Sequence, residues 1–312
     1  MQSDKKLKAI GKVLVFGASG QQGGAVVQSL VSRGVEVRAF VRDANEESSK
    51  QLVSLGVEIF LGDLFDDLAI GRALDGVDGV FCVLPNSGQG AVYGVTNEDE
   101  IRFGRTIIQS ALKSRVKHFV YSSTVAVSNG FTGVPHIDTK AELENSVRES
   151  GLKFTILRPT TIMETLISPG MGIDNGNYSF FVDPTESFQV IASQDIGEIA
   201  AGVFVNPAEN FGRILEIAGD EVSGLGLQTS LSQAANRPIL YSKFRDEILT
   251  SSNMMAGSAE LFRTGRLKGH ADIANLNSEF GKLLRFDEWL GSLGKQRLTA
   301  ALSLSGKPVV LR

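Results

Sequence analysis

Three glycines at fixed spacing follow an apolar run near the start of the chain. Residues 12–16 (KVLVF) lead directly into residues 17–23 (GASGQQG). Gly17 allows a tight turn, Gly20 lets the backbone approach a pyrophosphate, and Gly23 lets the next helix pack closely on the sheet. The free N–H groups and positive dipole end of that helix favour phosphate. We therefore predict a strand–loop–helix unit that binds a dinucleotide. Its binding residues are expected to be Gly17, Ser19, Gly20, Gln21, Gln22 and Gly23.

Strand and helix signals alternate through the first half of the chain. Strands are expected at 36–41, 57–61, 79–84, 118–122 and 154–157, and helices at 48–55, 98–114 and 140–150. Such alternation produces a parallel sheet that is covered by helices on both faces. We therefore predict an α/β fold with a Rossmann-type, doubly wound parallel sheet. Ligands of such sheets bind at the carboxyl ends of the strands.

The pattern changes after Arg158-Pro159. Residues 169–184 are rich in Gly, Asn and Pro, whereas a helix is expected near Asp195, as a possible N-cap, and a strand at 213–218. We predict two domains with discontinuous boundaries. The Rossmann domain covers 1–160 and is rejoined by 190–220. The smaller C-terminal α/β domain, for substrate or partner, covers 161–189 and 221–312.

Composition excludes several classes of function. The net charge is −4, and the chain has no long basic run, so we expect no direct nucleic-acid partner. Cys82 is the one cysteine, which excludes intramolecular disulfides, and its apolar surroundings favour a buried hydrophobic role. His118 and His270 have no ligand partners at metal-binding spacing, so no metal is expected.

The N-terminal residues and the hydropathy of the chain indicate its cellular compartment. The first eleven residues are polar and contain lysines, unlike a secretory signal. No apolar stretch approaches the length of a membrane span. We therefore expect a soluble, cytoplasmic protein without a membrane partner, and the sequence leaves its oligomeric state open.

A basic side chain follows the second predicted strand. A carboxylate there usually binds the ribose of NAD, whereas an arginine suits the 2′-phosphate of NADP. Arg42 ends this strand, and Lys50 could add a second positive charge, although Asp43 is adjacent. A guanidinium pairs bidentately with phosphate. We favour NADP(H) over NAD(H); the other interpretation is that Arg42 and Lys50 are solvated surface charges.

Several short motifs together resemble the NmrA-like family of the atypical short-chain dehydrogenase/reductase superfamily. They agree in order and spacing over about residues 12–220, and the remainder is unspecific. The motifs are GASGQQGG at 17–24, VRD at 41–43, GD at 62–63, VYSS at 120–123, HIDTK at 136–140, LRP at 157–159 and DIG at 195–197.

The resemblance implies a fold and a set of functions. It implies a dinucleotide held between a Rossmann domain and a smaller substrate domain, with Asp63 and Leu64 beside the adenine. The family includes NADPH-dependent reductases and also proteins that sense NADP(H) and regulate partners. Both an enzyme with a small-molecule substrate and a sensor with a protein partner are therefore open.

The usual catalytic tyrosine of the superfamily is absent. Typical members use Tyr and Lys four residues apart on one helix, with a Ser from the fifth strand. This chain has Lys140, but His136 occupies the tyrosine position, and Ser122 ends the fifth predicted strand. We expect Ser122 and Lys140 to bind the cofactor, and Lys140 is also the expected catalytic residue. His136 is either a general acid or a locally hydrogen-bonded side chain.

Two interpretations of function follow. In the first, the protein is an NADPH-dependent reductase of an electron-poor, quinone-like acceptor, and solvent supplies the proton. In the second, it binds NADP(H) without turnover and acts as a redox sensor. Further site residues are expected after the fourth and sixth strands. Pro85 and Asn86 should line the nicotinamide ribose, and Thr161, Met163 and Phe180 should contact substrate, although core packing explains Phe180 equally well.

Overall fold

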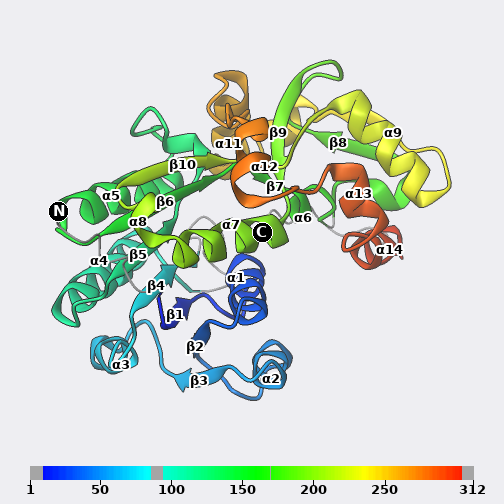
Figure 1. The fold of residues 1–312 in the computed structure, drawn as a ribbon. Helices are drawn as coiled ribbons and strands as arrows, with labels where there is room; N and C mark the ends of the chain where they lie inside the picture. The colour runs from blue at the N-terminus through cyan, green and yellow to red at the C-terminus, as the bar shows by residue number, and fades with distance from the viewer. Residues whose placement is uncertain (1–9, 86–93, 169, 304–312) are drawn as a thin grey trace. The chain divides into compact units, whose positions relative to one another are not determined.

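The computed structural model describes residues 10–85, 94–168 and 170–303, which fall into two compact units (Figure 1). Unit 1 contains residues up to Ser123, Thr139–Leu157 and Ile196–Leu215. Unit 2 contains Thr124–Asp138, Arg158–Asp195 and the residues from Glu216 onward. The segment 124–138, expected in the first domain, groups with unit 2 by its contacts. The substrate or partner role of the second domain stays a prediction.

A seven-stranded sheet forms the framework of unit 1, and the last residues of β6 and β10 pass into unit 2. Its strands run in the order β10-β6-β5-β4-β1-β2-β3, and neighbours from β6 to β3 pair in parallel. The predicted doubly wound parallel sheet is thus confirmed. The strands are β1 (Lys12–Phe16), β2 (Glu36–Val41), β3 (Glu58–Leu61), β4 (Gly79–Cys82), β5 (His118–Ser122), β6 (Phe154–Pro159) and β10 (Arg213–Ile217).

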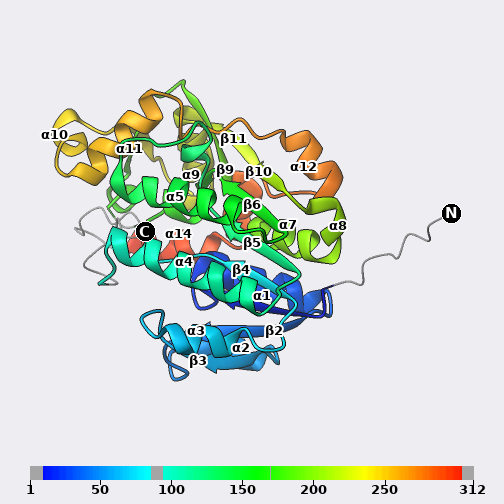
Figure 2. The same cartoon turned by 90° about the vertical axis from the view of Figure 1, so that its left-hand side faces the viewer.

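Helices cover this sheet. Helix α1 packs on β1 and β2, and α3 packs against α4. Helix α2 packs on β3, as Figure 2 also shows from the side. The core beneath them is apolar and includes Leu14, Phe16, Ile107 and Phe119. The helices are α1 (Gln21–Ser32), α2 (Glu47–Ser54), α3 (Asp67–Ala73), α4 (Asn97–Lys113), α5 (Pro135–Glu149), α7 (Ser193–Val205) and α8 (Pro207–Asn210).

Strand order reverses between β1 and β4. Phe16 at the end of β1 pairs in register with Cys82 at the end of β4. The next strand after β1 is β2 and the next after β4 is β5, and these two strands flank the β1–β4 pair on opposite sides. Ligands of doubly wound sheets bind at this switch point, beyond the carboxyl ends of the strands. The residues that follow β1 and β4 are therefore the first place to look for a site.

Unit 2 has small sheets and an aromatic core. In one sheet β7 (Thr161–Ile162) runs parallel to β9 (Ser187–Ile191), which β11 (Asp220–Ser223) joins antiparallel. In the other, β8 (Asn177–Phe180) pairs in parallel with β12 (Leu240–Lys243). The helices are α6 (Met163–Leu166), α9 (Gly224–Ala235), α10 (Asp246–Leu249), α11 (Asn253–Arg263), α12 (Ile273–Phe280), α13 (Phe286–Gly291) and α14 (Lys295–Ser303), with 3-10 turns at Val125–Val127 and Ile173–Asn175.

Three local assignments differ from the expectation. Helix α5 begins at Pro135 rather than near 140, because the carbonyl of Val134 accepts the N–H groups of Ile137 and Asp138 and starts the helix earlier. Helix α3 was not expected; Asp66 caps it through the N–H groups of the first turn. Asp195 is not an N-cap, since α7 already begins at Ser193.

Candidate functional site

The glycine loop after β1 is closed by its own backbone. Gly17 has φ +75°, and a Cβ there would lie 2.6 Å from a methyl carbon of Val83. The Gly20 N–H donates to the Gly17 carbonyl at 2.9 Å. A Cβ on Gly23 would lie 2.1 Å from the same carbonyl oxygen. Gly17 and Gly23 are therefore required by the protein's own packing, which leaves Gly20 on the open side of the loop.

The start of α1 offers unsatisfied donors. Gly20 is the N-cap, with extended backbone and no side chain to cap the helix, and Gln21 and Gln22 place no acid in the first turn. Helices have no internal partner for their first N–H groups. Ser19, Gly20 and Gln21 are exposed to solvent. A Cβ on Gly20 would come no closer than 3.3 Å to the surrounding described atoms, whereas a Cβ on Gly17 or Gly23 would overlap backbone atoms. Phosphate binding at this helix start stays a prediction.

One hydrogen bond joins the first turn of α1 to the end of β5. The Ser122 hydroxyl donates to Gln22 Oε1 at 2.7 Å, and Ser122 is buried. Residues that lie a hundred positions apart in the chain thus meet at the carboxyl edge of the sheet. The structure brings these two predicted cofactor residues into direct contact, which uses the proton of the serine hydroxyl and leaves its oxygen as an acceptor.

The basic side chains after β2 point into solvent. Arg42 and Lys50 are exposed, and the Arg42 side chain makes no hydrogen bond or ion pair with any residue in the described ranges. Asp43, the acid next to Arg42, is used locally: its Oδ1 accepts the Asn45 N–H at 2.8 Å, and its carbonyl accepts the Ser49 hydroxyl. The guanidinium therefore carries the accessible charge at this strand end.

Residues after β3 and β4 complete the carboxyl edge. Asp63 is exposed and accepts the Phe65 N–H at 2.9 Å, which shapes the turn after β3. Leu64 is half-buried and packs against the unit 1 core. Pro85 is half-buried after β4, whereas Asn86 lies outside the described residues. Apart from Lys140, which lies inside α5, the described cofactor residues predicted in unit 1 lie at or after the ends of neighbouring strands or in the first turn of the next helix.

Lys140 lies in a buried ion pair. Its ammonium nitrogen is 2.6 Å from Glu100 Oε1 of α4, and the two side chains are 13% and 1% exposed. Lys140 also donates to Thr139 Oγ1 at 3.2 Å. Burial lowers the pKa of Lys140, and the Glu100 carboxylate opposes that shift. The expected cofactor lysine therefore has an anionic partner inside the protein.

Glu100 is a functional candidate that the sequence did not reveal. It lies on α4 at the spacing of the buried residues Phe103, Gly104 and Ile107. An acidic residue on the apolar face of a helix was the available signal. Glu144 is a second buried carboxylate, and it accepts the Ser123 hydroxyl at 2.6 Å.

Tyr121 cannot replace the missing helical tyrosine. Its side chain is buried within β5, and burial raises its pKa well above the usual value, an effect that Glu100 reinforces. Cys82 is likewise buried and reduced, and burial raises the pKa of its thiol. Both side chains are therefore neutral core groups.

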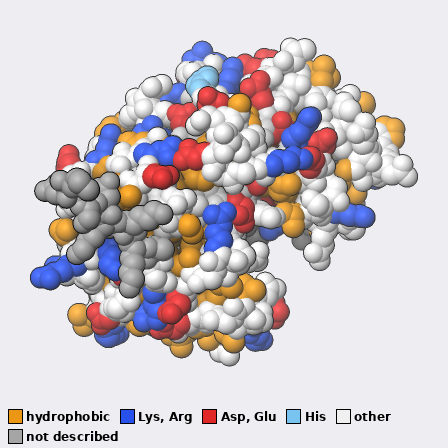
Figure 3. Space-filling view, in the orientation of Figure 1, with side chains coloured by type: hydrophobic (Ala, Val, Ile, Leu, Met, Phe, Trp, Pro, Cys, Tyr) orange, Lys and Arg blue, Asp and Glu red, His pale blue; other side chains and the backbone are white. Residues whose placement is uncertain are grey.

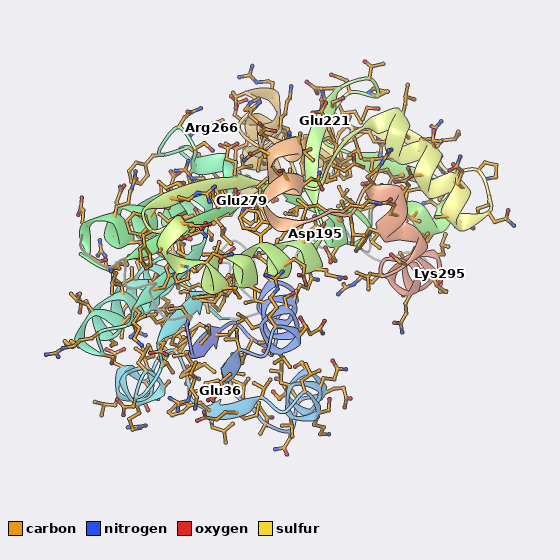
Figure 4. The ribbon with its side chains drawn as sticks, viewed as in Figure 1. Glu36, Asp195, Glu221, Arg266, Glu279 and Lys295 are labelled. Atoms are coloured by element: carbon orange, nitrogen blue, oxygen red, sulfur yellow. The ribbon has the colours of Figure 1, made fainter. Side chains whose placement is uncertain are left out.

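His136 stands in the first turn of α5, four residues and about one helical turn before Lys140. The loop that leads to this helix is firmly held in unit 2. Arg266, labelled in Figure 4, donates to the carbonyl oxygens of Ala126, Gly130 and Phe131. Asp138 accepts the N–H groups of Thr132 and Gly133. A fixed loop sets where α5 begins, although general acid catalysis by His136 stays a prediction.

The predicted substrate residues belong to unit 2. Thr161 is half-buried in β7, and Met163 is fully buried. Phe180 packs between Phe181, Phe188 and Phe262 at ring-centroid distances of 5.2–5.3 Å. Met163 and Phe180 are thus core side chains in this structure. Their contact with substrate stays a prediction.

Nearby polar groups in unit 2 stabilise the start of α7. Glu164, buried beside Met163, accepts the Ser193 N–H at 3.2 Å. Burial raises the pKa of Glu164, and these hydrogen bonds oppose the shift. Asp195, labelled in Figure 4, accepts the Leu284 N–H at 2.9 Å. These carboxylates act as structural acceptors.

Other classes of site find no support in the described part of the chain. Its His, Cys, Asp and Glu side chains form no group of three suited to a metal ion. No described helix is long and apolar enough to cross a membrane. Lys and Arg are interspersed with Asp and Glu on the face in Figure 3. The absence of a nucleic-acid partner stays a prediction.

Comparison with known proteins identifies related chains. The NmrA-like family matches residues 10–289, nearly the whole chain. The NmrA-like family domain-containing oxidoreductase himF of Aspergillus japonicus is 30% identical over 216 residues, 62% of this chain. That alignment spans 64% of the relative, slightly less than two thirds of its length.

Two solved structures share the fold. The negative transcriptional regulator NmrA, solved in complex with NAD, aligns with a TM-score of 0.77 at 18% identity, over 94% of this chain and 98% of that one. An NADPH-dependent quinone oxidoreductase of Escherichia coli, solved with NADPH, aligns with a TM-score of 0.73 at 20% identity, over 90% and 99%. At these identities the likeness concerns the fold.

Proposed function

Because this chain belongs to the NmrA-like family, we propose that it binds NADP(H) and reduces a small, electron-poor acceptor of the quinone type. The observation that carries this proposal is the glycine loop, in which Gly20 alone is left open beside the uncapped start of α1. The named oxidoreductase relative and the fold neighbour that binds NADPH support it.

The chain's own groups would hold the cofactor along the carboxyl edge of the sheet. Residues 17–23 bind the pyrophosphate, and Arg42 with Lys50 binds the 2′-phosphate. Asp63 and Leu64 border the adenine, while Ser122 and Lys140 bind the nicotinamide ribose. When bound, the cofactor supplies the hydride.

NADP(H) is preferred over NAD(H) in this proposal. Arg42 is exposed and has no side-chain partner among the described residues, while Asp43 is engaged by Asn45. A carboxylate that is already accepting a local N–H competes less for a ribose hydroxyl. A free guanidinium is suited to a phosphate.

The acceptor class follows from the missing acid. Tyr121 is a buried strand residue, and His136 stands where the superfamily has its tyrosine. Reduction of a quinone requires no strong protein acid, because solvent can protonate the product oxygen. Carbonyl reduction needs a positioned donor.

A redox sensor without turnover is the second candidate. The buried Lys140–Glu100 pair and the lack of a catalytic tyrosine four residues before Lys140 are compatible with cofactor binding without turnover. The fold neighbour NmrA is a negative transcriptional regulator that was solved with NAD, which favours this alternative. A sensor would act through a protein partner, since the sequence has no long basic run.

One experiment separates the candidates. NADPH absorbance is followed with quinone, azo, enone and carbonyl acceptors, and the association state is measured with NADP⁺ and NADPH. The reductase predicts consumption of NADPH that depends on the acceptor. No consumption with any acceptor, together with a change of association state between the two cofactor forms, would favour the sensor. The absence of binding to either cofactor would contradict both.

A further inference from the structure

A buried carboxylate on α4 contacts the lysine that the proposed function assigns to the cofactor. We propose that Glu100 is a positioning residue that keeps the Lys140 ammonium charged and in place for the nicotinamide ribose. Their atoms are 2.6 Å apart, and Glu100 is the less exposed partner. This role rests on the proposed function, because that function places Lys140 at the cofactor.

The location of Glu100 argues against a general packing role. It shares the buried face of α4 with Phe103, Gly104 and Ile107. An ionised carboxylate costs free energy there unless it is paired, whereas an apolar side chain would pack without that cost. The distinctive effect of Glu100 is therefore the effect on its partner, the Lys140 ammonium.

Among the groups around Lys140, Glu100 is the carboxylate in direct contact with its ammonium. Burial lowers the pKa of Lys140, and Glu100 is the group that raises it. The neighbouring Cys82 and Tyr121, from β4 and β5, are neutral because burial raises both of their pKa values. Glu144, one turn further along α5, accepts the Ser123 hydroxyl. Without Glu100, Lys140 would lose the carboxylate that opposes the lowering of its pKa by burial.

The same two helices carry a matched control. Arg105 of α4 and Glu142 of α5 also form an ion pair, but their side chains are 52% and 33% exposed. Exposed ion pairs contribute little to stability. Glu142→Gln therefore removes a carboxylate from the α4–α5 contact without touching the buried pair, and Glu100→Gln removes the buried one.

The test reads Lys140 directly. The full-length protein is labelled at lysine Cε with ¹³C, the Lys140 signal is assigned by its loss in Lys140→Arg, and its pKa is titrated. NADPH affinity is measured in parallel from pH 6 to pH 9 by fluorescence. In Glu100→Gln we expect a lower Lys140 pKa and, at the alkaline end, NADPH binding about tenfold weaker than in the parent. Glu142→Gln should match the parent in both.

Glu100→Asp separates charge from position and guards against a Gln variant that does not fold. This variant keeps the negative charge, but its side chain is one methylene shorter, so the carboxylate lies farther from the Lys140 ammonium. We expect a Lys140 pKa near that of the parent, with NADPH affinity reduced at every pH. An unchanged affinity would overturn the positioning role.

The experiment distinguishes failure of the Glu100 proposal from failure of the proposed function. A Lys140 pKa that is the same in Glu100→Gln and the parent would overturn the proposal, whatever the protein's activity. A lowered pKa with the parent's profile of NADPH affinity against pH would also overturn it, because Lys140 would not act on the cofactor. A parent protein that binds no NADPH would instead contradict the proposed function.

Discussion

Gly23 lies so close to Gly17 that a Cβ on Gly23 would stand 2.1 Å from the Gly17 carbonyl oxygen. The same oxygen accepts the Gly20 N–H at 2.9 Å. One carbonyl thus anchors the whole loop between β1 and α1. The three glycines of this loop consequently differ: Gly17 and Gly23 permit the fold, whereas Gly20 is exposed and is predicted to face the ligand.

Substitutions at Gly20 and Gly23 should therefore have opposite effects. Gly20→Val should abolish dinucleotide binding with the fold intact, because its backbone is extended and a Cβ there contacts the protein no closer than 3.3 Å. Gly23→Ala should lower the thermal midpoint, because a backbone carbonyl must move. Circular dichroism and NADPH titration measure both effects. A folded Gly20→Val that binds NADPH like the parent would refute the loop assignment.

Arg42→Asp should change cofactor choice without changing stability. We expect NADPH binding to weaken by roughly 1.5–3 kcal/mol, the range for a hydrogen bond to a charged group, with little effect on NADH. The thermal midpoint should stay unchanged, since the exposed side chain has no partner among the described residues. Calorimetry of both cofactors checks this. Equal affinities of the parent for NADPH and NADH would remove its basis.

Lys140 and Glu100 should be strongly coupled in a double-mutant cycle. Lys140→Met removes the ammonium that contacts a buried carboxylate, and Glu100→Gln removes the carboxylate that contacts a buried ammonium. Each should therefore cost about 3–5 kcal/mol of unfolding free energy. The double variant should cost much less than the sum. Urea unfolding gives these values. Additive costs would show that the pair is not formed in solution.

His118 should make the protein less stable in mild acid. Its ring is fully buried between Phe204 and Phe211, and burial lowers its pKa from 6.5 to about 4. Between these values the unfolded state binds a proton that the folded state does not, so the unfolding free energy falls as pH falls from about 6.5 to about 4. The loss amounts to about 3 kcal/mol at the acid end.

A neutral variant isolates this effect from the carboxylates. Thr155 donates its hydroxyl to the Asn210 carbonyl, so His118 Nε2 must donate to Thr155 Oγ1, at 2.8 Å. His118→Gln can supply a similar donor and does not titrate. Urea unfolding at pH 4 to pH 7 should show a shallower fall in this variant. Parallel curves would exclude His118 as the cause.

Arg266 should control the order of the loop before α5. Its guanidinium donates to Ala126 at 3.0 Å and to Phe131 at 2.9 Å, and also to Gly130. Arg266→Lys keeps the charge but loses the planar set of donors, so it cannot satisfy these carbonyls together. Amide hydrogen exchange should accelerate in residues 126–134 and not in β1 to β5. Uniform acceleration would indicate general destabilisation instead.

The sequence by itself determined the framework. The apolar runs and the glycines at 17, 20 and 23 are local signals, and they predicted the parallel sheet and the loop after β1. The strand ends placed Arg42, Asp63 and Ser122 on one edge, because parallel strands share a direction. Such features depend on residues close in the chain, whose patterns can be recognised directly.

Tertiary structure decided which side chains are available. Lys140 meets Glu100 across forty positions of the chain, and Ser122 meets Gln22 across a hundred. No local pattern indicates such pairs, because they depend on how α4, α5 and α1 pack on the sheet. The sequence suggested that Met163 and Phe180 contact substrate, yet packing buries both side chains in unit 2. Burial is a property of the assembled core, and a side chain's chemistry follows from it.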